Sequence, residues 1–397
     1  MAKLLVLFVT AFVDMVGFAL VLPLLPYYAT QFGANALLVG VLVSAFSVAQ
    51  LAVAPLWGRA SDRYGRRPMI IAGLALSAVA YVVFAFAGSV WLLLLSRVVQ
   101  GMGGGTIGVV QAYVADATPP DQRTQSLGWL SAVTSFGAVV GPAFGSFLDQ
   151  AGGHAAPGLA AAVLATLIAV FAGRFLKESR EMRASGAFDA AHPRTTGRVA
   201  VRRVVARPSE PASRLIWIYT IAIGAFYGTG PTMPLLLSAR LGVTEHGIGY
   251  FFMYFGAMGV VARAGLLGWA LAWLGEARLS RLGIVLLASG LCLLSLARGY
   301  PVLLASMTLM PLGTAFLFPC VTGLLSQVVP GADRGLYMGV QQTFGGVSRV
   351  AFPVAAGYAM DRFGYGSPFL VAALLVLLTL PLTGAMAGYA KTREVMR

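Results

Sequence analysis

Apolar and polar stretches alternate along this chain with a long and regular period. Twelve of the apolar stretches approach or exceed the roughly 20 residues that a helix needs to cross the hydrocarbon core of a bilayer. They occupy residues 4–28, 36–57, 68–87, 91–115, 124–149, 157–177, 214–238, 247–273, 280–297, 300–328, 335–360 and 366–388. The pattern predicts an all-α membrane protein with twelve transmembrane helices.

One long polar stretch interrupts this pattern, at residues 178–213. We interpret it as a cytoplasmic linker between two six-helix bundles, which gives domains at 1–177 and 214–397. Its arginines fit either an amphipathic helix on the membrane surface or a solvated linker; they are Arg198, Arg202, Arg203 and Arg207. Composition agrees with a membrane protein, because only 11% of the residues are charged, against roughly 25% in soluble domains.

The net charge of +14 raises the question of nucleic-acid binding, but the positions of the charges indicate another cause. Most Lys and Arg residues lie in alternate connections and near the two ends, whereas Arg240, Arg298 and Arg362 lie in the opposite set. The positive-inside rule then predicts cytoplasmic termini. We attribute the basicity to membrane topology and to attraction for anionic lipids, and we expect no nucleic-acid partner.

The two halves of the sequence repeat each other. Pro23-x-x-Pro26 recurs as Pro231-x-x-Pro234, and further pairs follow at a nearly constant separation. These pairs are Gly58 and Gly268, Gly65 and Gly275, Ser96 and Ser306, Gly103 and Gly313, Arg123 and Arg334, Gly128 and Gly339, and Pro142 and Pro353. The repeat predicts two equivalent bundles related by an axis along the membrane normal, which is an architecture suited to alternating access.

The copies differ in their ionisable groups. Asp14, Asp62 and Arg97 correspond to Ala222, Ala272 and Met307, so only the first half retains charge at these positions. We infer that energy coupling lies in the first half. The second half carries aromatic residues near the expected midplane, which fit a substrate-binding wall or ordinary packing and lipid contact: Phe226, Tyr227, Tyr254, Phe255, Phe316 and Phe318.

Asp14 is the one acid deep within a predicted span. It lies about 16 Å along the helix from Lys3 at the usual rise. A carboxylate at this depth is costly unless it is paired, protonated or in contact with a water-filled cavity. We therefore predict a proton-coupling role for Asp14, with a structural hydrogen bond to a neighbouring helix as the alternative.

Helices four and five carry two further motifs. The first is Arg97-x-x-Gln100-Gly101-x-Gly103 and the second is Gly137-x-x-x-Gly141-Pro142-x-x-Gly145-Ser146. Their glycines favour close helix packing, and Pro142 favours a kink. The overlapping Gly103-x-Gly105-x-x-Gly108 has the spacing of a dinucleotide site, but no strand precedes it and we reject that interpretation.

The connection between the second and third spans has the most specific motif in the chain. It reads Gly-Arg-Ala-Ser-Asp-Arg-Tyr-Gly-Arg-Arg-Pro and includes Gly58, Asp62, Arg63, Gly65, Arg66 and Arg67. It resembles the signature loop of the major facilitator superfamily. The helix-one, helix-four and helix-five motifs resemble those of its tetracycline and multidrug branch, except that Ser146 replaces the final glycine of the helix-five motif.

The resemblance covers essentially the whole chain and implies a fold and an activity. It implies a central substrate cavity, proton antiport across a cell membrane, Arg97 as part of a proton relay, and the charged loop as a cytoplasmic latch. In that latch we expect Asp62 to accept hydrogen bonds from the start of helix eleven and from an arginine. Tetracycline exporters carry further acids in helices three and nine, and this chain has none there, so tetracycline itself is not predicted.

We expect a proton-coupled exporter of amphipathic small molecules that acts as a monomer, with protons and membrane lipids as its other partners and no cofactor or metal. A flippase or exporter of an anionic or lipid-like molecule is the alternative, and a receptor or scaffold is a third class. No enzyme motif is found, and the histidines fit solvated connections: His154, His192 and His246.

Substrate charge is where the residues and the resemblance differ. Arg349 falls near the middle of helix eleven, and Arg263 falls near the end of helix eight, where it fits a side chain that reaches the interface. With Arg97 they give the cavity a positive balance, which favours an anionic or zwitterionic group. Arg349 alternatively pairs with Asp14 or with helix-end carbonyls. Gln100 and Gln341 are further candidates for substrate contact.

Overall fold

The computed structural model describes residues 2–104, 106–118, 122–178, 197–330 and 333–384, and in these ranges the regular structure is helical, with no β-strand. The helices form two compact units. The first contains residues 1–189 and 242–256, and the second contains residues 190–241 and 257–397. Residues 242–256 follow the seventh span in sequence but pack in the first unit. The division into domains at 178–213 stays a prediction.

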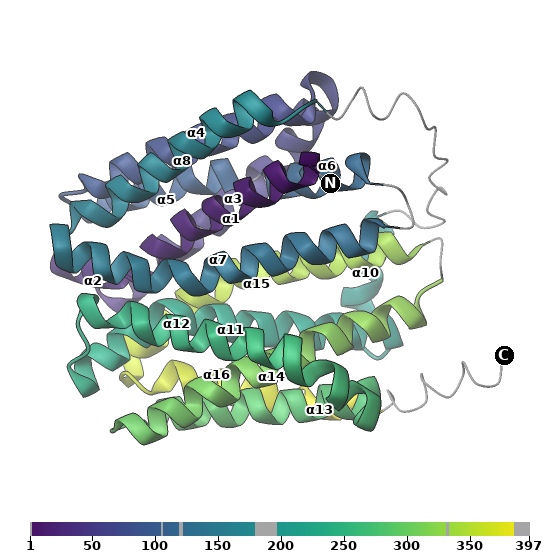
Figure 1. Cartoon of the computed structure of the whole chain (residues 1–397). Helices are drawn as coiled ribbons and strands as arrows, with labels where there is room; N and C mark the ends of the chain where they lie inside the picture. The colour runs from purple at the N-terminus through teal and green to yellow at the C-terminus, as the bar shows by residue number, and fades with distance from the viewer. Residues whose placement is uncertain (1, 105, 119–121, 179–196, 331–332, 385–397) are drawn as a thin grey trace. The chain divides into compact units, whose positions relative to one another are not determined.

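The first unit is built from α1 to α8 and the beginning of α12 (Figure 1). In it α1 packs on α7 and α8, α4 packs on α5 and α8, and α3 packs on α5. The bounds are α1 Ala2–Val21, α2 Leu25–Gln31, α3 Ala36–Tyr64, α4 Arg66–Ala85, α5 Val90–Gly104, α6 Ile107–Ala117, α7 Arg123–Gly152, α8 Ala155–Phe175 and α12 Glu245–Val261.

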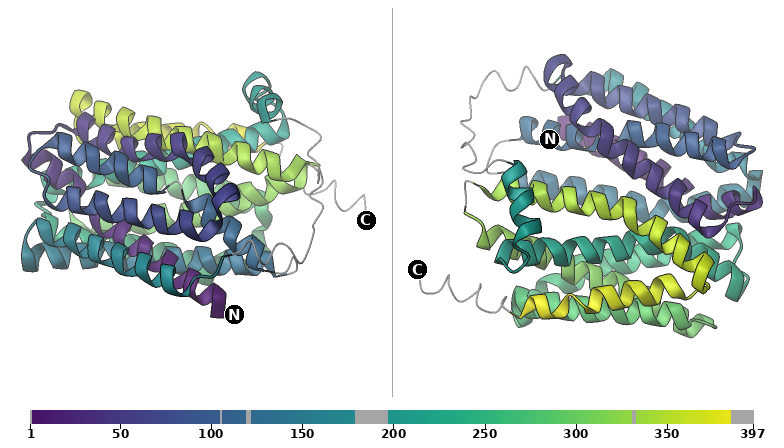
Figure 2. Two further views of the ribbon diagram at one scale, coloured as in Figure 1. Left: turned by 90° about the horizontal axis from the view of Figure 1, so that it is seen from above. Right: turned by 180° about the vertical axis from the view of Figure 1, so that it is seen from behind.

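The second unit contains the remaining helices (Figures 1 and 2). Here α13 packs on α14 and α16, and α11 packs on α15 and α16. The bounds are α10 Gly197–Ala206, α11 Pro211–Leu241, η1 Ala262–Leu266, α13 Leu267–Leu296, α14 Tyr300–Val328, α15 Arg334–Phe363, α16 Ser367–Leu377 and η3 Leu380–Thr383.

The twelve predicted spans correspond to these helices, with breaks that the sequence did not predict. Eight described segments are apolar and long enough to cross a membrane. One of them, Glu245–Leu296, reverses at Gly275 and so supplies both the eighth and ninth spans. The predicted seventh, eleventh and twelfth spans are α11, α15 and α16 with η3, whose sequences are less apolar or shorter. Prolines after Val21 divide the first span, since Pro26 lies in the first turn of α2, which begins at Leu25.

Glycine turns repeat in the two halves. The described residues with positive φ are all glycines, and they fall into three pairs at equivalent turns: Gly33 and Gly242, Gly65 and Gly275, and Gly153 and Gly364. Because L-residues with a Cβ rarely adopt positive φ, each turn favours glycine. The shared backbone geometry supports the internal repeat predicted from the sequence.

Helix packing repeats as well. A Cβ on Gly103 would lie 2.8 Å from the Gly73 carbonyl oxygen, and a Cβ on Gly313 would lie 2.8 Å from the Gly283 carbonyl oxygen. Both distances are too short for a carbon side chain. The third and fourth spans of each half therefore touch through their backbones, which only glycine permits.

The described part of the predicted linker contains a helix, so the solvated-linker alternative does not hold there. In α10, Ala200 and Val204 are fully buried, and α10 packs on α11 and α15 (Figure 2). Arg203 and Arg207 face Glu210 at 2.6 and 3.2 Å. The hydrogen bond from Arg203 lowers the pKa of the Glu210 carboxyl. Residues 179–196 lie outside the described residues.

We predict that two glycines of the same helix respond oppositely to alanine. A Cβ on Gly145 would overlap the Leu20 backbone, whereas a Cβ on Gly128 meets open space. Gly145→Ala should therefore lower the thermal unfolding midpoint, because overpacking costs about 1–3 kcal/mol. Gly128→Ala should leave it unchanged or raise it, since alanine favours helix. Thermal unfolding of the purified variants in detergent measures both, and equal midpoints would contradict this packing.

Candidate functional site

The helix-five motif lies directly against the helix that carries Asp14. A Cβ on Gly137 would approach the Phe12 carbonyl oxygen to 2.8 Å, and one on Gly141 would approach the Val16 carbonyl oxygen to the same distance. Gly145 continues the contact at Leu20. The glycines of α7 thus bring its backbone into contact with α1 over more than two turns. Pro142 lies within the same stretch of α7.

Tyr81 of α4 covers the next turn of α1. Its hydroxyl lies 3.5 Å from the position of a Cβ on Gly17, three residues after Asp14, and Tyr81 is 1% exposed. Asp14 and Arg97 both interact electrostatically with the Tyr81 phenol. The structure therefore brings Asp14 and Arg97 into one neighbourhood, with Tyr81 as a shared neighbour that sequence reasoning missed.

Arg97 is deeply buried and incompletely satisfied. It is 1% exposed, and its Nε and Nη2 atoms have no hydrogen-bond partner among the described residues. Its guanidinium carbon lies 5.8 Å from the centre of the Phe84 ring. Gln100, one turn later, is also buried, and its side chain is a neighbour of Tyr81. Unsatisfied groups of this kind are costly in a membrane and typical of a functional site.

Asp14 is only partly buried. In the part of the chain that the structure describes it forms no ion pair, so the carboxylate and Arg97 share a site without a direct salt bridge. The predicted alternative, a structural hydrogen bond from Asp14, has no support among these residues.

Two glycines fix the position of Arg97 and Gln100. A Cβ on Gly101 would overlap the carbonyl oxygen of Phe46 on α3, while Gly103 meets Gly73 on α4. Helix α5 is therefore held tightly between its two neighbours. Because the α5 backbone is in direct contact with both neighbouring helices, the Arg97 side chain is held between them.

The charged motif differs from the expected loop. Helix α3 extends to Tyr64 and α4 starts at Arg66, so Asp62 lies in the last turn of α3 rather than beyond it. The turn is Gly65 alone, at φ +103°. Positive φ allows the chain to reverse at a single residue. A Cβ added to Gly58 would meet open space. The guanidinium carbon of Arg63 lies 5.3 Å from the centre of the Tyr64 ring.

Arg66 is the centre of the polar contacts at this turn. It contacts Asp62 at 2.9 Å and Asp116 of α6 at 3.2 Å. The Asp116 side chain is 17% exposed and the Asp62 side chain is 65% exposed. Since solvent weakens exposed ion pairs, Asp116 is the stronger partner, and the sequence analysis did not identify it.

Glu178 completes this end of the unit. Its carboxylate accepts hydrogen bonds from the backbone N–H of Arg66 at 2.9 Å and of Arg67 at 3.2 Å. An acid in this position caps the positive end of α4. Arg67 also donates to the Gly173 carbonyl. The predicted contact between Asp62 and the start of the eleventh span, which is α15, would connect the two units, and it stays a prediction.

In the second unit, Arg349 lies near an aromatic ring. Its guanidinium carbon lies 5.2 Å from the centre of the Tyr227 ring, and its Nε has no hydrogen-bond partner among the described residues. Tyr227 also packs edge-on against Phe226 at 5.7 Å. Gln341 is fully buried and accepts a hydrogen bond from Thr322 at 3.3 Å. Arg263, in η1, donates a hydrogen bond to the Gly259 carbonyl at 3.5 Å.

The other predicted aromatic residues do not form a single wall in one unit. Phe316 is 6% exposed and belongs to a hydrophobic cluster with Ala262 and Cys320. Phe318 packs against Tyr219 at 5.5 Å. Tyr254 and Phe255 lie on the part of α12 that belongs to the first unit. Their role in substrate contact stays a prediction.

His154 and His246 are about half exposed, and both also contact a buried acid that the sequence did not indicate. His154 Nδ1 lies 3.1 Å from Asp149 Oδ1, and His246 Nδ1 lies 3.0 Å from Asp149 Oδ2. Asp149 itself is fully buried at the end of α7. The sequence did not reveal the cluster because its members come from separate turns. His192 lies outside the described residues.

Comparison of the sequence with known proteins identifies its family. The model of the Major Facilitator Superfamily matches residues 7–279 and 215–391. Multidrug resistance protein 1 of Bacillus subtilis (strain 168) is 27% identical over 380 residues, which are 95% of this chain and 94% of that protein. The class G tetracycline resistance protein of Vibrio anguillarum is 28% identical over 389 residues, covering 93% and 94%.

A solved transporter structure also resembles this chain over nearly its full length. The human organic anion transporter MFSD10 matches with a TM-score of 0.69 and 26% identity, covering 96% of this chain and 99% of that chain. Each of these matches runs nearly the full length of both proteins. The predicted resemblance to drug antiporters and the predicted fold are therefore confirmed: the protein is a multi-pass membrane transporter, and the chain belongs to the Major Facilitator Superfamily.

Proposed function

We propose that the protein exports amphipathic small molecules in exchange for protons by alternating access. The observation that carries this proposal is the arrangement of Asp14, Tyr81 and Arg97 within the first unit. It combines a carboxylate without an ion pair and a buried guanidinium whose Nε and Nη2 have no hydrogen-bond partner among the described residues. Similarity to multidrug and tetracycline resistance proteins supports the same substrate class.

Proton exchange at Asp14 changes the charge of this cluster. With the proton bound, Asp14 is neutral and Arg97 is the cluster's remaining charge. After release, the carboxylate is attracted toward the guanidinium, with which it shares Tyr81 as a neighbour. Helix α1 bears both Asp14 and the backbone surface on which the α7 glycines pack. A change of charge on α1 is thereby transmitted to α7 without an intervening side-chain layer.

The contacts of Arg66 support a cytoplasmic latch. They connect the ends of α3, α4 and α6, and Glu178 connects the segment after α8 to the same point. By the positive-inside rule this end is cytoplasmic. We propose that these contacts stabilise one of the two access states.

An anionic substrate is the second candidate, and one observation favours it. Arg349 lies over the Tyr227 ring, and no ion pair of Arg349 occurs among the described residues. A guanidinium in this position is available to a carboxylate, sulfonate or phosphate group. Similarity to an organic anion transporter is consistent with this specificity.

We predict that Asp14→Asn abolishes proton-driven uphill transport. The amide has nearly the same volume but cannot exchange a proton, so accumulation of a fluorescent amphiphile in proteoliposomes under a pH gradient should fall to the level of protein-free liposomes. Substrate exchange without a gradient should persist and shows that the variant is folded. Asp361→Asn, at an exposed acid near the end of α15, is the control. Uphill accumulation by Asp14→Asn would exclude Asp14 as the coupling site.

For the latch, we predict that Asp116→Asn has a larger effect than Asp62→Asn. The first substitution removes the less exposed carboxylate facing Arg66, and the second removes one that is mostly solvated. Spin-label distances between the Gly65 turn and the Gly275 turn should shift toward the open state further in Asp116→Asn. A larger shift in Asp62→Asn would reverse the assignment of the main partner.

For the substrate, we predict that Arg349→Gln weakens binding of an amphipathic anion by about tenfold, corresponding to roughly 1.4 kcal/mol. A cationic amphiphile of matched size should bind equally well or better, because a positive charge is lost. Arg362→Gln, an exposed arginine near the end of the same helix, should affect neither. Competition binding to purified protein makes the comparison, and equal losses for both ligands would contradict recognition of the anion.

A further inference from the structure

A buried carboxylate lies at the end of the first unit opposite the Gly65 turn. Its two oxygen atoms have different neighbours. Asp149, in the last turn of α7, has a fully buried side chain. Its Oδ1 accepts a hydrogen bond from the Tyr28 hydroxyl at 2.6 Å and lies 3.1 Å from His154 Nδ1. This oxygen is satisfied and its orientation is fixed.

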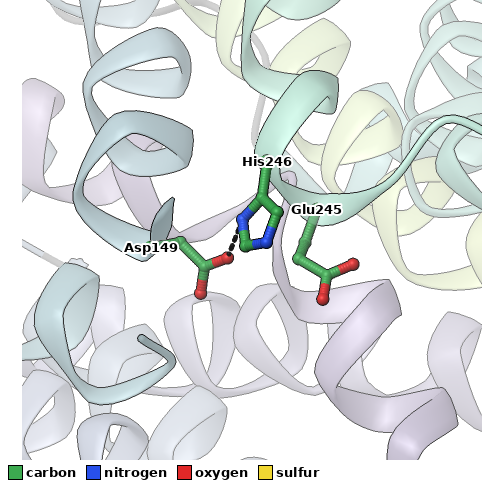
Figure 3. A group of neighbouring side chains, drawn as sticks. All are labelled: Asp149, Glu245 and His246. Atoms are coloured by element: carbon green, nitrogen blue, oxygen red, sulfur yellow. Dashed lines mark ion pairs between the residues drawn. The ribbon is translucent and has the colours of Figure 1, made fainter. Parts of the chain in front are cut away.

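The second oxygen of Asp149 faces the start of α12. Oδ2 is buried and has no hydrogen-bond partner among the described residues, although His246 Nδ1 lies only 3.0 Å away. Glu245 precedes His246 at the start of α12. One ligand atom from each of Asp149, Glu245 and His246 lies within 4.8 Å of the others (Figure 3).

This geometry is compatible with a bound metal ion as well as with an ion pair between Asp149 and His246. Two ligands of one tetrahedral zinc ion, at about 2.0–2.1 Å from the metal, lie roughly 3.3 Å apart. The separation of Asp149 Oδ2 and His246 Nδ1 is close to that value without a hydrogen bond between them. Bonds from Tyr28 and His154 to the other oxygen resemble the outer contacts that orient metal-binding carboxylates.

The backbone around the three residues is held in place. Ser146 Oγ donates to the Glu245 carbonyl at 2.7 Å and accepts from the Gly249 N–H at 2.9 Å. Gly249 packs against the backbone of Pro142, where a Cβ would overlap the carbonyl. The start of α12 is therefore positioned on α7.

We propose that Asp149, Glu245 and His246 bind a divalent transition-metal ion, best fitted by Zn²⁺, which restrains the start of α12 on α7. One imidazole and two carboxylates are a donor set that zinc accepts, and water completes the coordination. His246 is about half exposed, at 48% of its side chain, so an ion reaches the site from the aqueous phase. An effect of this restraint on transport rests on the alternating access proposed above.

Metal binding is testable without transport. Protein purified without a polyhistidine tag should bind Zn²⁺ saturably in isothermal titration calorimetry, and Zn²⁺ but not Mg²⁺ should raise its thermal unfolding midpoint. His246→Ala should lose both effects while folding normally without metal. Asp149→Asn, which retains the acceptor for Tyr28, should lose both as well. His192→Ala, at the histidine of the central connection, is the matched control and should bind as the unmodified protein does.

Two results would overturn the metal site: no saturable Zn²⁺ binding by the unmodified protein, or undiminished binding by His246→Ala. Either would leave an Asp149–His246 ion pair. In proteoliposomes, Zn²⁺ should inhibit transport by the unmodified protein and not by His246→Ala. Binding without inhibition would overturn the restraint on α12. Because calorimetry requires no transport, failure of the metal site is distinguishable from failure of the proposed antiport.

Discussion

Direct contact between helix backbones is the constraint on which the rest of the first unit depends. Gly137, Gly141 and Gly145 place α7 on α1, and Gly101 places α5 on α3. Such contacts leave no layer of side chains that could absorb a displacement. Asp14 and Arg97 are consequently held on rigid, closely packed helices, and a change in charge at either one acts on the helices themselves.

Polar contacts hold both ends of the same unit. Arg66 and Glu178 connect helices at the Gly65 turn, whereas Asp149 and Ser146 connect α7 to the start of α12 at the other end. A protein that opens alternately to the two sides needs contacts that form and break at each end. The exporter proposal thus assigns a role to both groups, and the Asp14 cluster lies on the helices between them.

The sequence predicted the features that follow from local chemistry. Apolar length revealed the spans, and the glycine pairs revealed the repeat, since a positive φ or a backbone contact leaves few alternatives to glycine. It did not predict Tyr81, Asp116 or Asp149 as partners, because tertiary packing brings them together from distant segments. Asp62 was placed beyond its helix because glycine and arginine suggested a loop, yet Gly65 alone makes the turn.

Proton release on substrate binding tests the central claim most directly. A pH-indicator dye in weakly buffered detergent solution, at a pH at which the substrate-free protein still holds the Asp14 proton, reports protons as substrate is added to purified protein. The account predicts that the unmodified protein releases protons with a saturation curve that follows substrate binding, and that Asp14→Asn binds substrate without release. Equal release by both proteins would show that another group exchanges the proton and would contradict the account.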